Sequence, residues 1–464
     1  MAKINYIFKE IGESLSGKER DYTKENLKRA IFLLSIPMIL EMAMESIFAI
    51  ADIYFVSKIS PEAVATVGLT ESLMTIVYSI SFGLSVAASA IISRRIGENN
   101  KEKASKTAVQ AIFSGVFVSI IIGLPGLLFA SEILRFIGAS ENVIFNYSGY
   151  ASIMFGSNIV ITLLFIINGI FRSAGDPAIS MRVLWVSNVI NIILDPILIF
   201  GWWIFPQMGI EGAATATAIG RGVGVIYQFY ILFKRKSRIN LNLKMFKLDF
   251  EIIKKIFRLS VGSIGQNIIS TSSWIGLMAI LATFGSLSVA GYTIAIRIII
   301  FSLLPSWGIS NAAGTLVGQN LGAEQPDRAE KSVWITGKYN LIVLGIIGII
   351  YILIPDFWIS LLTSDKEVIQ KGAEALRIVS YGFLAYGYGM VVLHAFNGAG
   401  DTTTPTKINI ICFWFVEIPL AYLLSKILNF GEQGVFYSIV IAETCLTIIS
   451  IIIFKKGKWK IKIV

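Results

Sequence analysis

Long apolar segments dominate this chain and limit what it can fold into. A helix needs roughly 20 mostly apolar residues to cross a bilayer. Twelve segments meet this requirement, at about 30–57, 62–93, 107–130, 141–171, 180–203, 209–233, 252–284, 289–318, 332–355, 368–396, 405–428 and 433–454. Only 15% of the residues are charged, against about 25% in soluble domains. We therefore predict an all-α membrane protein with twelve transmembrane helices.

The two halves of the chain resemble each other at a fixed separation in residue number. Leu34-Ser35 has its counterpart in Leu259-Ser260, and Ala174-Gly175-Asp176 in Ala399-Gly400-Asp401, so the separation is 225 at both places. This repeat predicts two pseudo-symmetric six-helix bundles. An even number of spans gives both bundles the same orientation in the membrane, so the repeat is expected to be parallel.

The repeat and the charged segments set the predicted domain boundaries. We expect an N-terminal segment at 1–29, a first lobe at 30–233, a basic linker at 234–251, a second lobe at 252–454 and a basic tail at 455–464. With the N-terminus inside, most of the 40 lysines and arginines fall in cytoplasmic segments. This positive-inside bias predicts that both termini are cytoplasmic. It also accounts for the net charge of +10 without a nucleic-acid partner.

Two aspartates lie inside apolar segments of the first lobe. Asp52 falls in the first span and Asp195 in the fifth, where a carboxylate costs about 3 kcal/mol or more unless it faces a partner or a cavity. Asn191 shares a helix face with Asp195, because it lies four residues earlier. Tyr150 and Thr217 lie about as deep as the two aspartates, roughly 8 to 13 Å below the outer ends of their spans. We predict that these five residues form one polar layer.

Such a layer is suited to a cation. Carboxylate, amide and hydroxyl oxygens are ligands for Na⁺, and two close carboxylates can share a proton instead. The alternative is a hydrogen-bonded network that only fixes the helices. At the fixed separation of 225, the counterparts in the second lobe are all apolar: Leu277, Ala375, Val416, Leu420 and Ala442. A device needed only for folding should occur in both lobes, so we expect the polar layer to be functional.

Two prolines and four glutamates are further candidates. Pro37 should bend the first span, and Pro196 should free a carbonyl beside Asp195, so both prolines are expected to act as conformational hinges. The glutamates within spans are candidate residues of a substrate cavity, namely Glu41, Glu45, Glu417 and Glu443.

Several segments of the first half resemble a known transporter family. They are LSIPMIL in the first span, AD-I-Y-F-V around Asp52, NGIFRSAGD before NIILDP, and GIEGAATATAIGR after the fifth span. Together with the two six-helix lobes, these segments resemble the multidrug and toxic compound extrusion (MATE) transporters, in particular the prokaryotic DinF-like branch. The resemblance implies a location in a bacterial or archaeal plasma membrane.

The resemblance also implies an activity and the roles of particular residues. It implies an antiporter that expels amphipathic, often cationic organic compounds while Na⁺ or H⁺ flows inward, by alternating access between the lobes. The ion would be bound by Asp52, Asn191, Asp195 and Thr217, with Tyr150 in the same network, and Pro37 would be the point where the first helix bends.

Other branches of the family carry acidic coupling residues in the second lobe. Here Gln266 begins the seventh span and no carboxylate follows Glu374 in the tenth, which favours coupling in the first lobe. Phe165 departs from relatives that carry an amide there.

Other functional classes fit the sequence less well. A flippase for lipid-linked saccharides or lipids, from the same superfamily, remains the alternative, although such carriers need a cationic cavity. A membrane prenyltransferase would need two Asp-rich motifs, and only one aspartate occurs in NIILDP. Cys412 and Cys445 form no disulfide or metal pattern.

We expect a protein that is not an enzyme and has no cofactor besides the coupling ion. It should act as a monomer, with small organic molecules and membrane lipids as its partners.

Overall fold

All twelve predicted spans are helices. The computed structural model describes residues 2–17, 19–234 and 237–462, and no strand occurs among them. Eleven helices are long and apolar enough to cross a membrane. A pair bent by 56°, Lys366–Ser380 with Phe383–Gly398, supplies the twelfth span. The chain is therefore an all-α, multi-pass membrane protein.

The helices form two compact units whose divisions lie inside helices. The first unit comprises Met1–Arg20 with Leu40–Ser260, and the second comprises Asp21–Ile39 with Val261–Val464. These divisions fall within α2 (Leu27–Ser57) and α10 (Phe250–Ala282) rather than in the predicted linker. One reason is that Leu34 and Met38 of α2 pack with Leu316 in the core of the second unit.

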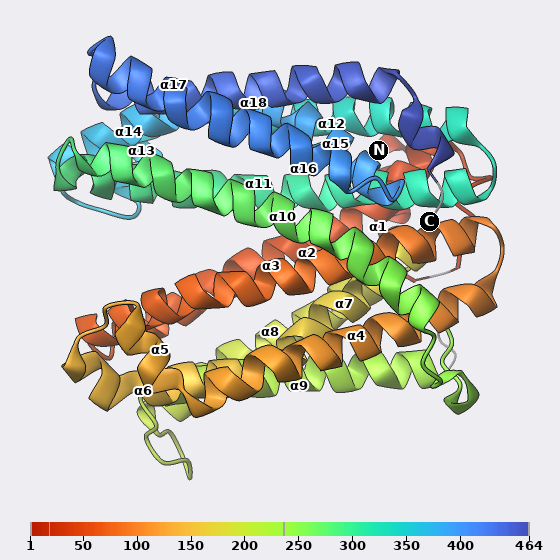
Figure 1. Cartoon of the computed structure of the whole chain (residues 1–464), viewed down its shortest axis with the longest axis horizontal. Helices are drawn as coiled ribbons and strands as arrows, with labels where there is room; N and C mark the ends of the chain where they lie inside the picture. Colours follow the sequence, from red (N-terminus) through yellow and green to blue (C-terminus); the bar gives the residue numbers. More distant parts are fainter. Residues whose placement is uncertain (1, 18, 235–236, 463–464) are drawn as a thin grey trace. The chain divides into compact units, whose positions relative to one another are not determined.

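The first unit is a helical bundle in which two helices approach with backbone contact. Besides parts of α2 and α10, it contains α1 (Ala2–Leu15), α3 (Pro61–Gly97), α4 (Lys101–Leu128), α5 (Ala130–Phe136), α6 (Glu141–Gly156), α7 (Asn158–Ala174), α8 (Pro177–Phe200), α9 (Ile210–Phe233) and a 3₁₀ turn at Leu243–Met245. α8 packs along α9, and α3 packs along α4 and α7 (Figure 1). A Cβ on Gly220 would lie 2.7 Å from the Ser187 carbonyl oxygen. Glycine therefore lets α9 lie directly against α8.

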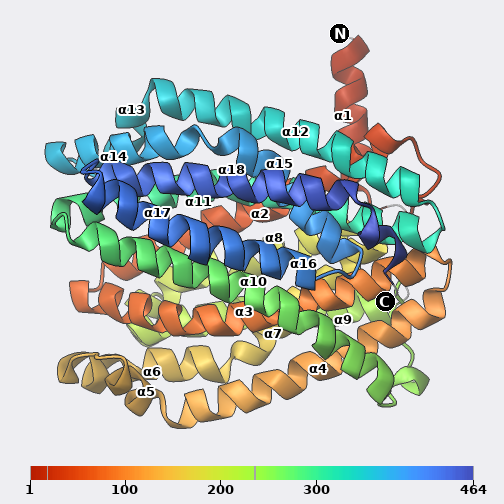
Figure 2. The same cartoon turned by 45° about the horizontal axis from the view of Figure 1, so that its top comes forward.

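The second unit repeats this bundle and adds irregular turns to one helix. It contains α11 (Ser286–Gly322), α12 (Pro326–Leu353), α13 (Pro355–Ser360), α14 (Lys366–Ser380), α15 (Phe383–Gly398), α16 (Thr403–Asn409), α17 (Ile418–Tyr422), α18 (Glu432–Lys455), π-helical segments at Ile410–Glu417 and Leu423–Ile427, and a 3₁₀ turn at Lys458–Ile461. α12 and α18 both pack against α15 (Figure 2). α16, the π segments and α17 together form one span, Thr403–Ile427.

The ends of the helices show how far the fixed separation holds. α3 and α11 begin at 61 and 286 and end at 97 and 322, a separation of 225 at both ends, and α4 and α12 do the same. Asn99 and Glu324 keep this separation, and both have a φ of 58°. The repeat predicted from the sequence is therefore present through these helices.

The separation changes in the last two spans. Trp203 and Asn429, at a separation of 226, have φ angles of 62° and 57°. Gly209 and Gly431, at a separation of 222, cap α9 and α18 with φ angles of 59° and 61°. A π-helical turn accommodates one additional residue in a helix, and Ile410–Glu417 has no such counterpart in α8. The prediction of one constant register is wrong for these spans.

Candidate functional site

Asp195 is a buried carboxylate without a protein partner. It lies on α8 and is 0% exposed, and neither carboxylate oxygen has a hydrogen-bond partner among the described residues. Pro196 lies inside the same helix and cannot donate a hydrogen bond to the carbonyl one turn earlier. A buried carboxylate is stable only when a charge, a proton or hydrogen bonds compensate it. The surroundings of Asp195 therefore leave its oxygens available to a cation.

Asn191 and Thr217 add neutral oxygens next to Asp195. Asn191 precedes Asp195 by one turn of α8, and its amide nitrogen donates to the Thr217 hydroxyl oxygen on α9 at 3.0 Å. This bond turns the Asn191 carbonyl oxygen away from Thr217, and that oxygen is buried without a partner in the described part of the chain. The close approach of α8 and α9 thus leaves carboxylate, amide and hydroxyl oxygens together, which are suitable ligands for a hard cation such as Na⁺.

Asp52 and Tyr150 lie in the same region of the first unit. The carboxylate of Asp52, on α2, is close enough to Asp195 for the two charges to interact. Tyr150, on α6, is 3% exposed and lies within electrostatic range of both aspartates. The structure thus brings together all five residues of the predicted polar layer, which we call the oxygen cluster: Asp52, Tyr150, Asn191, Asp195 and Thr217.

The two predicted hinge prolines remain within continuous helices. Pro37 lies inside α2, two residues before the division between the compact units after Ile39. Pro196 lies inside α8, which continues to Phe200. A proline weakens its helix locally without ending it when the surroundings hold both sides. The role of these prolines as hinges stays a prediction.

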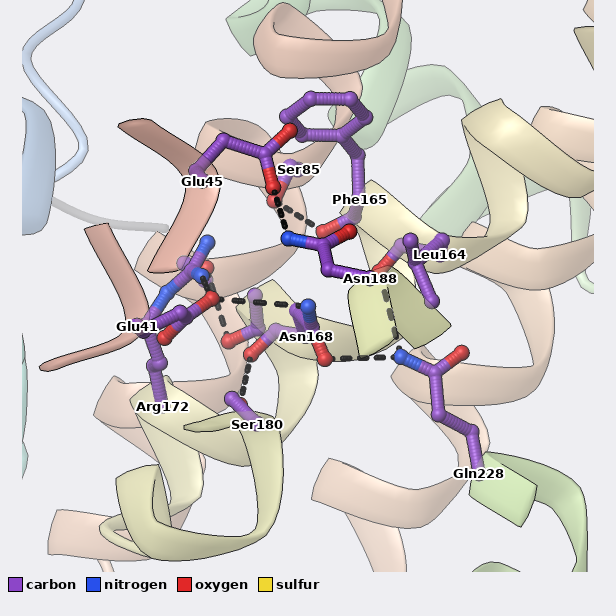
Figure 3. Close-up of polar contacts among 12 residues, drawn as sticks. Glu41, Glu45, Ser85, Leu164, Phe165, Asn168, Arg172, Ser180, Asn188 and Gln228 are labelled. Carbon is purple, nitrogen blue, oxygen red and sulfur yellow. Dashed lines mark hydrogen bonds and ion pairs between the residues drawn. The ribbon is translucent and has the colours of Figure 1, made fainter. Parts of the chain in front are cut away.

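Glu41 and Arg172 form a buried ion pair in the first unit (Figure 3). Arg172 on α7 donates to Glu41 on α2 at 2.6 Å, and the Glu41 side chain is 2% exposed. Asn168 also donates to Glu41, at 3.4 Å, and accepts from Gln228 at 2.8 Å. Glu41 thus lies inside a packed polar network of the first unit, and its predicted role in a substrate cavity stays a prediction.

Glu45 is held in a second ion pair, one turn further along α2. Arg221 on α9 donates to Glu45 at 2.7 Å, and Asn188 on α8 donates to it at 3.0 Å. Figure 3 shows Asn188 reaching Glu45 from the helix that also carries Asp195. The second predicted cavity glutamate is therefore also neutralised by an arginine.

Glu71 and Tyr78 belong to this region but were missed in the sequence. Glu71 on α3 lies within electrostatic range of Asp52, Glu45 and Arg221, and Tyr78 follows it on the same helix face. The ring of Tyr78 lies 6.2 Å from that of Phe165, so the position where relatives carry an amide is aromatic here. The criterion that identified Asp52, an acidic residue within an apolar segment, would also have found Glu71.

The corrected register changes the comparison between the units. At a separation of 226, Asn191 corresponds to Glu417 and Asp195 to Ala421, instead of Val416 and Leu420. At a separation of 222, Thr217 corresponds to Ile439 instead of Ala442. The counterparts of Asp195 and Thr217 are apolar in either register, whereas Asn191 has the apolar Val416 at a separation of 225 and Glu417 at a separation of 226.

Glu417 and Glu443 lie close together in the second unit. Glu417 accepts a hydrogen bond from Ser273, and Glu443 lies within electrostatic range of Glu417 and Tyr386. Both glutamates are at most 8% exposed. The counterpart of Glu443 at the separation of 222 is Arg221, so the two units carry opposite charges at this position. Whether this pair contributes to a substrate cavity stays a prediction.

The sequence pattern of one protein family matches this chain twice, once in each half. The MatE family pattern matches residues 37–197 and again residues 263–423. The chain belongs to the MatE family. The two matches are 226 residues apart at both their starts and their ends, so the family pattern is itself duplicated along the chain. The protein is thus a multi-pass membrane transporter.

Curated relatives match over nearly the whole chain. It is 26% identical to the "Probable multidrug resistance protein NorM" of Thermotoga maritima over 436 residues, covering 94% of this chain and 93% of the relative. It is 26% identical to the "Probable multidrug resistance protein YoeA" of Bacillus subtilis over 89% of this chain and 90% of the relative. The "Multidrug export protein MepA" of Staphylococcus aureus is 25% identical over 93% and 94%.

Solved structures of similar transporters share the fold. A structure described as a MATE protein in complex with MaL6 has a TM-score of 0.89 and 26% identity, over 94% of this chain and 97% of that one. An outward-facing multidrug resistance MATE transporter has a TM-score of 0.90 and 25% identity, over 96% and 100%. A Pyrococcus furiosus transporter of the MOP superfamily, whose binding pocket is described as having reverse polarity, has a TM-score of 0.89 and 25% identity, over 95% and 98%.

Proposed function

We propose that this protein is a secondary active antiporter that exports amphipathic, often cationic organic compounds in exchange for inward Na⁺ or H⁺. The observation that carries the proposal is the buried, unpartnered carboxylate of Asp195 next to Asp52. Intramembrane carboxylates of this kind mark ion pathways and proton relays. The names of the curated multidrug relatives support the class of substrate.

The oxygen cluster would bind the coupling ion. Asp195 and Asp52 would supply the negative charge, and Asn191 and Thr217 would supply neutral ligand oxygens if the ion is Na⁺. If the ion is H⁺, the two aspartates would share it, with Tyr150 as a hydrogen-bonding neighbour. Binding of either ion removes the repulsion between the two carboxylates, so it favours a conformation in which they lie close together.

Alternating access would couple this event to export. We expect the ion to bind from outside, α2 to change its bend near Pro37, and the substrate to leave. The ion would then be released to the cytoplasm while a new substrate binds. We expect both termini to be cytoplasmic and the membrane to be a bacterial or archaeal plasma membrane. No cofactor besides the ion is needed for this cycle, and a monomer is sufficient.

A flippase for lipid-linked saccharides or lipids is the alternative. Such a carrier would use free arginines or lysines to bind pyrophosphate. Arg172 and Arg221 of the first unit are each bound by a glutamate, Glu41 and Glu45 respectively. The first unit therefore offers uncompensated acidic groups to a ligand, which favours a cation over a lipid phosphate.

Efflux of ethidium from a drug-sensitive bacterium tests the proposal. Wild type should export the dye, and Asp52→Asn and Asp195→Asn should each abolish export at matched expression. The control is Asp365→Asn, because asparagine retains the oxygen that caps α14 at 2.9 and 3.1 Å. Varying Na⁺ and pH separately identifies the coupling ion.

Two outcomes would contradict the proposal. Export that survives both aspartate substitutions would mean that the oxygen cluster has only a structural role. No export by wild type, together with transbilayer movement of a fluorescent lipid-linked saccharide in proteoliposomes, would identify a flippase.

A further inference from the structure

The ion pair between Arg221 and Glu45 lies directly beside the oxygen cluster. Arg221 follows Thr217 by one helical turn on α9, whereas Glu45 precedes Asp52 by about two turns on α2. The Arg221 guanidinium lies over the ring of Phe48, which precedes Asp52 by about one turn of α2. The positive end of the ion pair therefore lies within about one helical turn of both Thr217 and Asp52.

Arg221 is held firmly in this position. It is 7% exposed and donates to both carboxylate oxygens of Glu45, at 2.7 and 3.4 Å. Its guanidinium group also lies 4.9 Å from the centre of the Phe48 ring. Asn188 fixes the same Glu45 carboxylate from α8 at 3.0 Å. Glu45 and Phe48 of α2 therefore hold the guanidinium group in place, and Asn188 fixes Glu45 from α8.

The second unit carries neither the cluster nor the positive charge. Ala421 and Ile439 stand where Asp195 and Thr217 stand in the first unit, and Glu443 stands where Arg221 stands. The second unit forms the equivalent helices without a positive charge at this position, so the fold does not require the charge of Arg221. Ser270, the counterpart of Glu45 at the separation of 225, offers no charge to pair with.

We infer that Arg221 is a positioning residue that weakens cation binding by the oxygen cluster and so allows the coupling ion to be released. This inference rests on the proposed function and names how its ion site is regulated. Two buried carboxylates would hold a cation too tightly to exchange it rapidly. A fixed positive charge near Asp52 lowers the affinity for either Na⁺ or H⁺ by roughly tenfold, as expected from Coulomb interaction at a partly screened site.

The other titratable groups of this region are unchanged in the test variants. They are the cluster members Asp52, Tyr150 and Asp195, and Glu71 and Tyr78 of α3, which lie within electrostatic range of Asp52. Substitutions at Arg221 and Glu45 therefore change one ion pair against a constant background.

The experiment measures ethidium efflux from proteoliposomes as a function of Na⁺ concentration and, separately, of pH. Arg221→Gln should lower the half-saturating Na⁺ concentration about tenfold, or raise the pH of half-maximal efflux by about one unit, and reduce the maximal rate. Arg221→Lys should stay close to wild type. Glu45→Gln should shift the half-saturating concentration in the opposite direction, because it leaves the positive charge unopposed.

A double variant keeps the test decisive if a single substitution prevents folding. Arg221→Gln with Glu45→Gln leaves no unpaired buried charge. Because it removes the nearer positive end, it should also bind the cation more tightly than wild type. Unchanged or weaker cation binding in both Arg221→Gln and the double variant would overturn the inference.

Direct binding separates this inference from the proposed function. Purified protein is titrated calorimetrically with NaCl, with choline chloride as the control, and proton uptake is followed with an indicator dye. If wild type binds a cation but exports nothing, the proposed function fails, and the shift in the Arg221→Gln titration still decides the inference. Wild type that binds neither Na⁺ nor H⁺ overturns both.

Discussion

Gln266 and Asn397 exchange two amide hydrogen bonds, each of 3.1 Å. At the separation of 225, they are the counterparts of Glu41 and Arg172, which form an ion pair of 2.6 Å. The same position in the bundle is thus occupied by a neutral pair in one unit and by a charged pair in the other. Since both pairs fix the first helix of a repeat to the fourth span, the charges are not required for this contact.

The neutral pair should be transferable to the first unit. Glu41→Gln or Arg172→Asn alone should destabilise the protein by about 3 to 5 kcal/mol, because each removes one partner of an ion pair whose carboxylate is buried. The double variant should recover about 1 to 3 kcal/mol of this loss. Thermal unfolding in detergent measures the four proteins. Additive losses would show that the two side chains are not energetically coupled.

Asp195 should lower the stability of the fold, although it is needed for transport. Replacing it with leucine removes a buried, unsatisfied carboxylate, so the free energy of unfolding should rise by about 1 to 3 kcal/mol, while ion-dependent efflux is lost. The reverse change at the counterpart, Ala421→Asp, should destabilise the second unit by about 3 kcal/mol or more. Chemical denaturation with parallel efflux assays tests both changes. A less stable Asp195→Leu protein would contradict this account.

Asp176 should make the stability depend on pH. This aspartate lies in the turn between α7 and α8, where burial raises its pKa although Arg238 and Ser237 donate hydrogen bonds to it. Because the folded pKa lies above the unfolded value, the carboxyl group favours folding at acid pH. This contribution is lost as the pH rises through the folded pKa.

The Asp176→Asn variant isolates this contribution. Asparagine can still accept from Ser237 and Arg238 but does not titrate. The Tm of Asp176→Asn relative to wild type should therefore increase between about pH 4 and about pH 7. Ser237→Ala, which removes one bond to the carboxylate, should make the pH dependence of the Tm steeper than in wild type. Parallel curves for wild type and Asp176→Asn would disprove the assignment.

The C-terminal tail should stabilise the second unit through Trp459. Its ring is 1% exposed and stacks on Phe454 at 4.5 Å, and its indole nitrogen donates to the Phe454 carbonyl oxygen at 2.9 Å. Trp459→Ala should lower the free energy of unfolding by about 3 to 5 kcal/mol. Trp459→Phe keeps the stacking and loses only the hydrogen bond, so it should cost about 1 kcal/mol. Equal stability of all three proteins would show that the tail is not packed.

Periodic and repeated features of the sequence were sufficient to predict the spans and the pseudo-symmetry. Apolar length defines a membrane helix, and a shared separation such as that between Asp176 and Asp401 survives wherever the helices keep their length. The members of the oxygen cluster could also be predicted, because Asp52 and Asp195 are costly in an apolar segment.

Side-chain partners and register changes were beyond the sequence alone. The additional residue between Asp401 and Asn429 falls in a span with π-helical turns at Ile410–Glu417 and Leu423–Ile427, and no residue type marks it. The arginines that neutralise Glu41 and Glu45 come from α7 and α9, at separations of 131 and 176 along the chain. Such pairings depend on how helices face each other, which periodicity does not specify.

Because the unit boundaries lie inside α2 and α10, the chain cannot be divided between its two halves into two complete bundles. Each unit includes the opening segment of a helix whose remainder belongs to the other unit. Separate expression of residues 1–249 and 250–464 would thus give two fragments, each lacking a segment that completes its own bundle. A fragment designed to fold as one bundle should therefore carry the opening helical segment that the other half of the chain supplies.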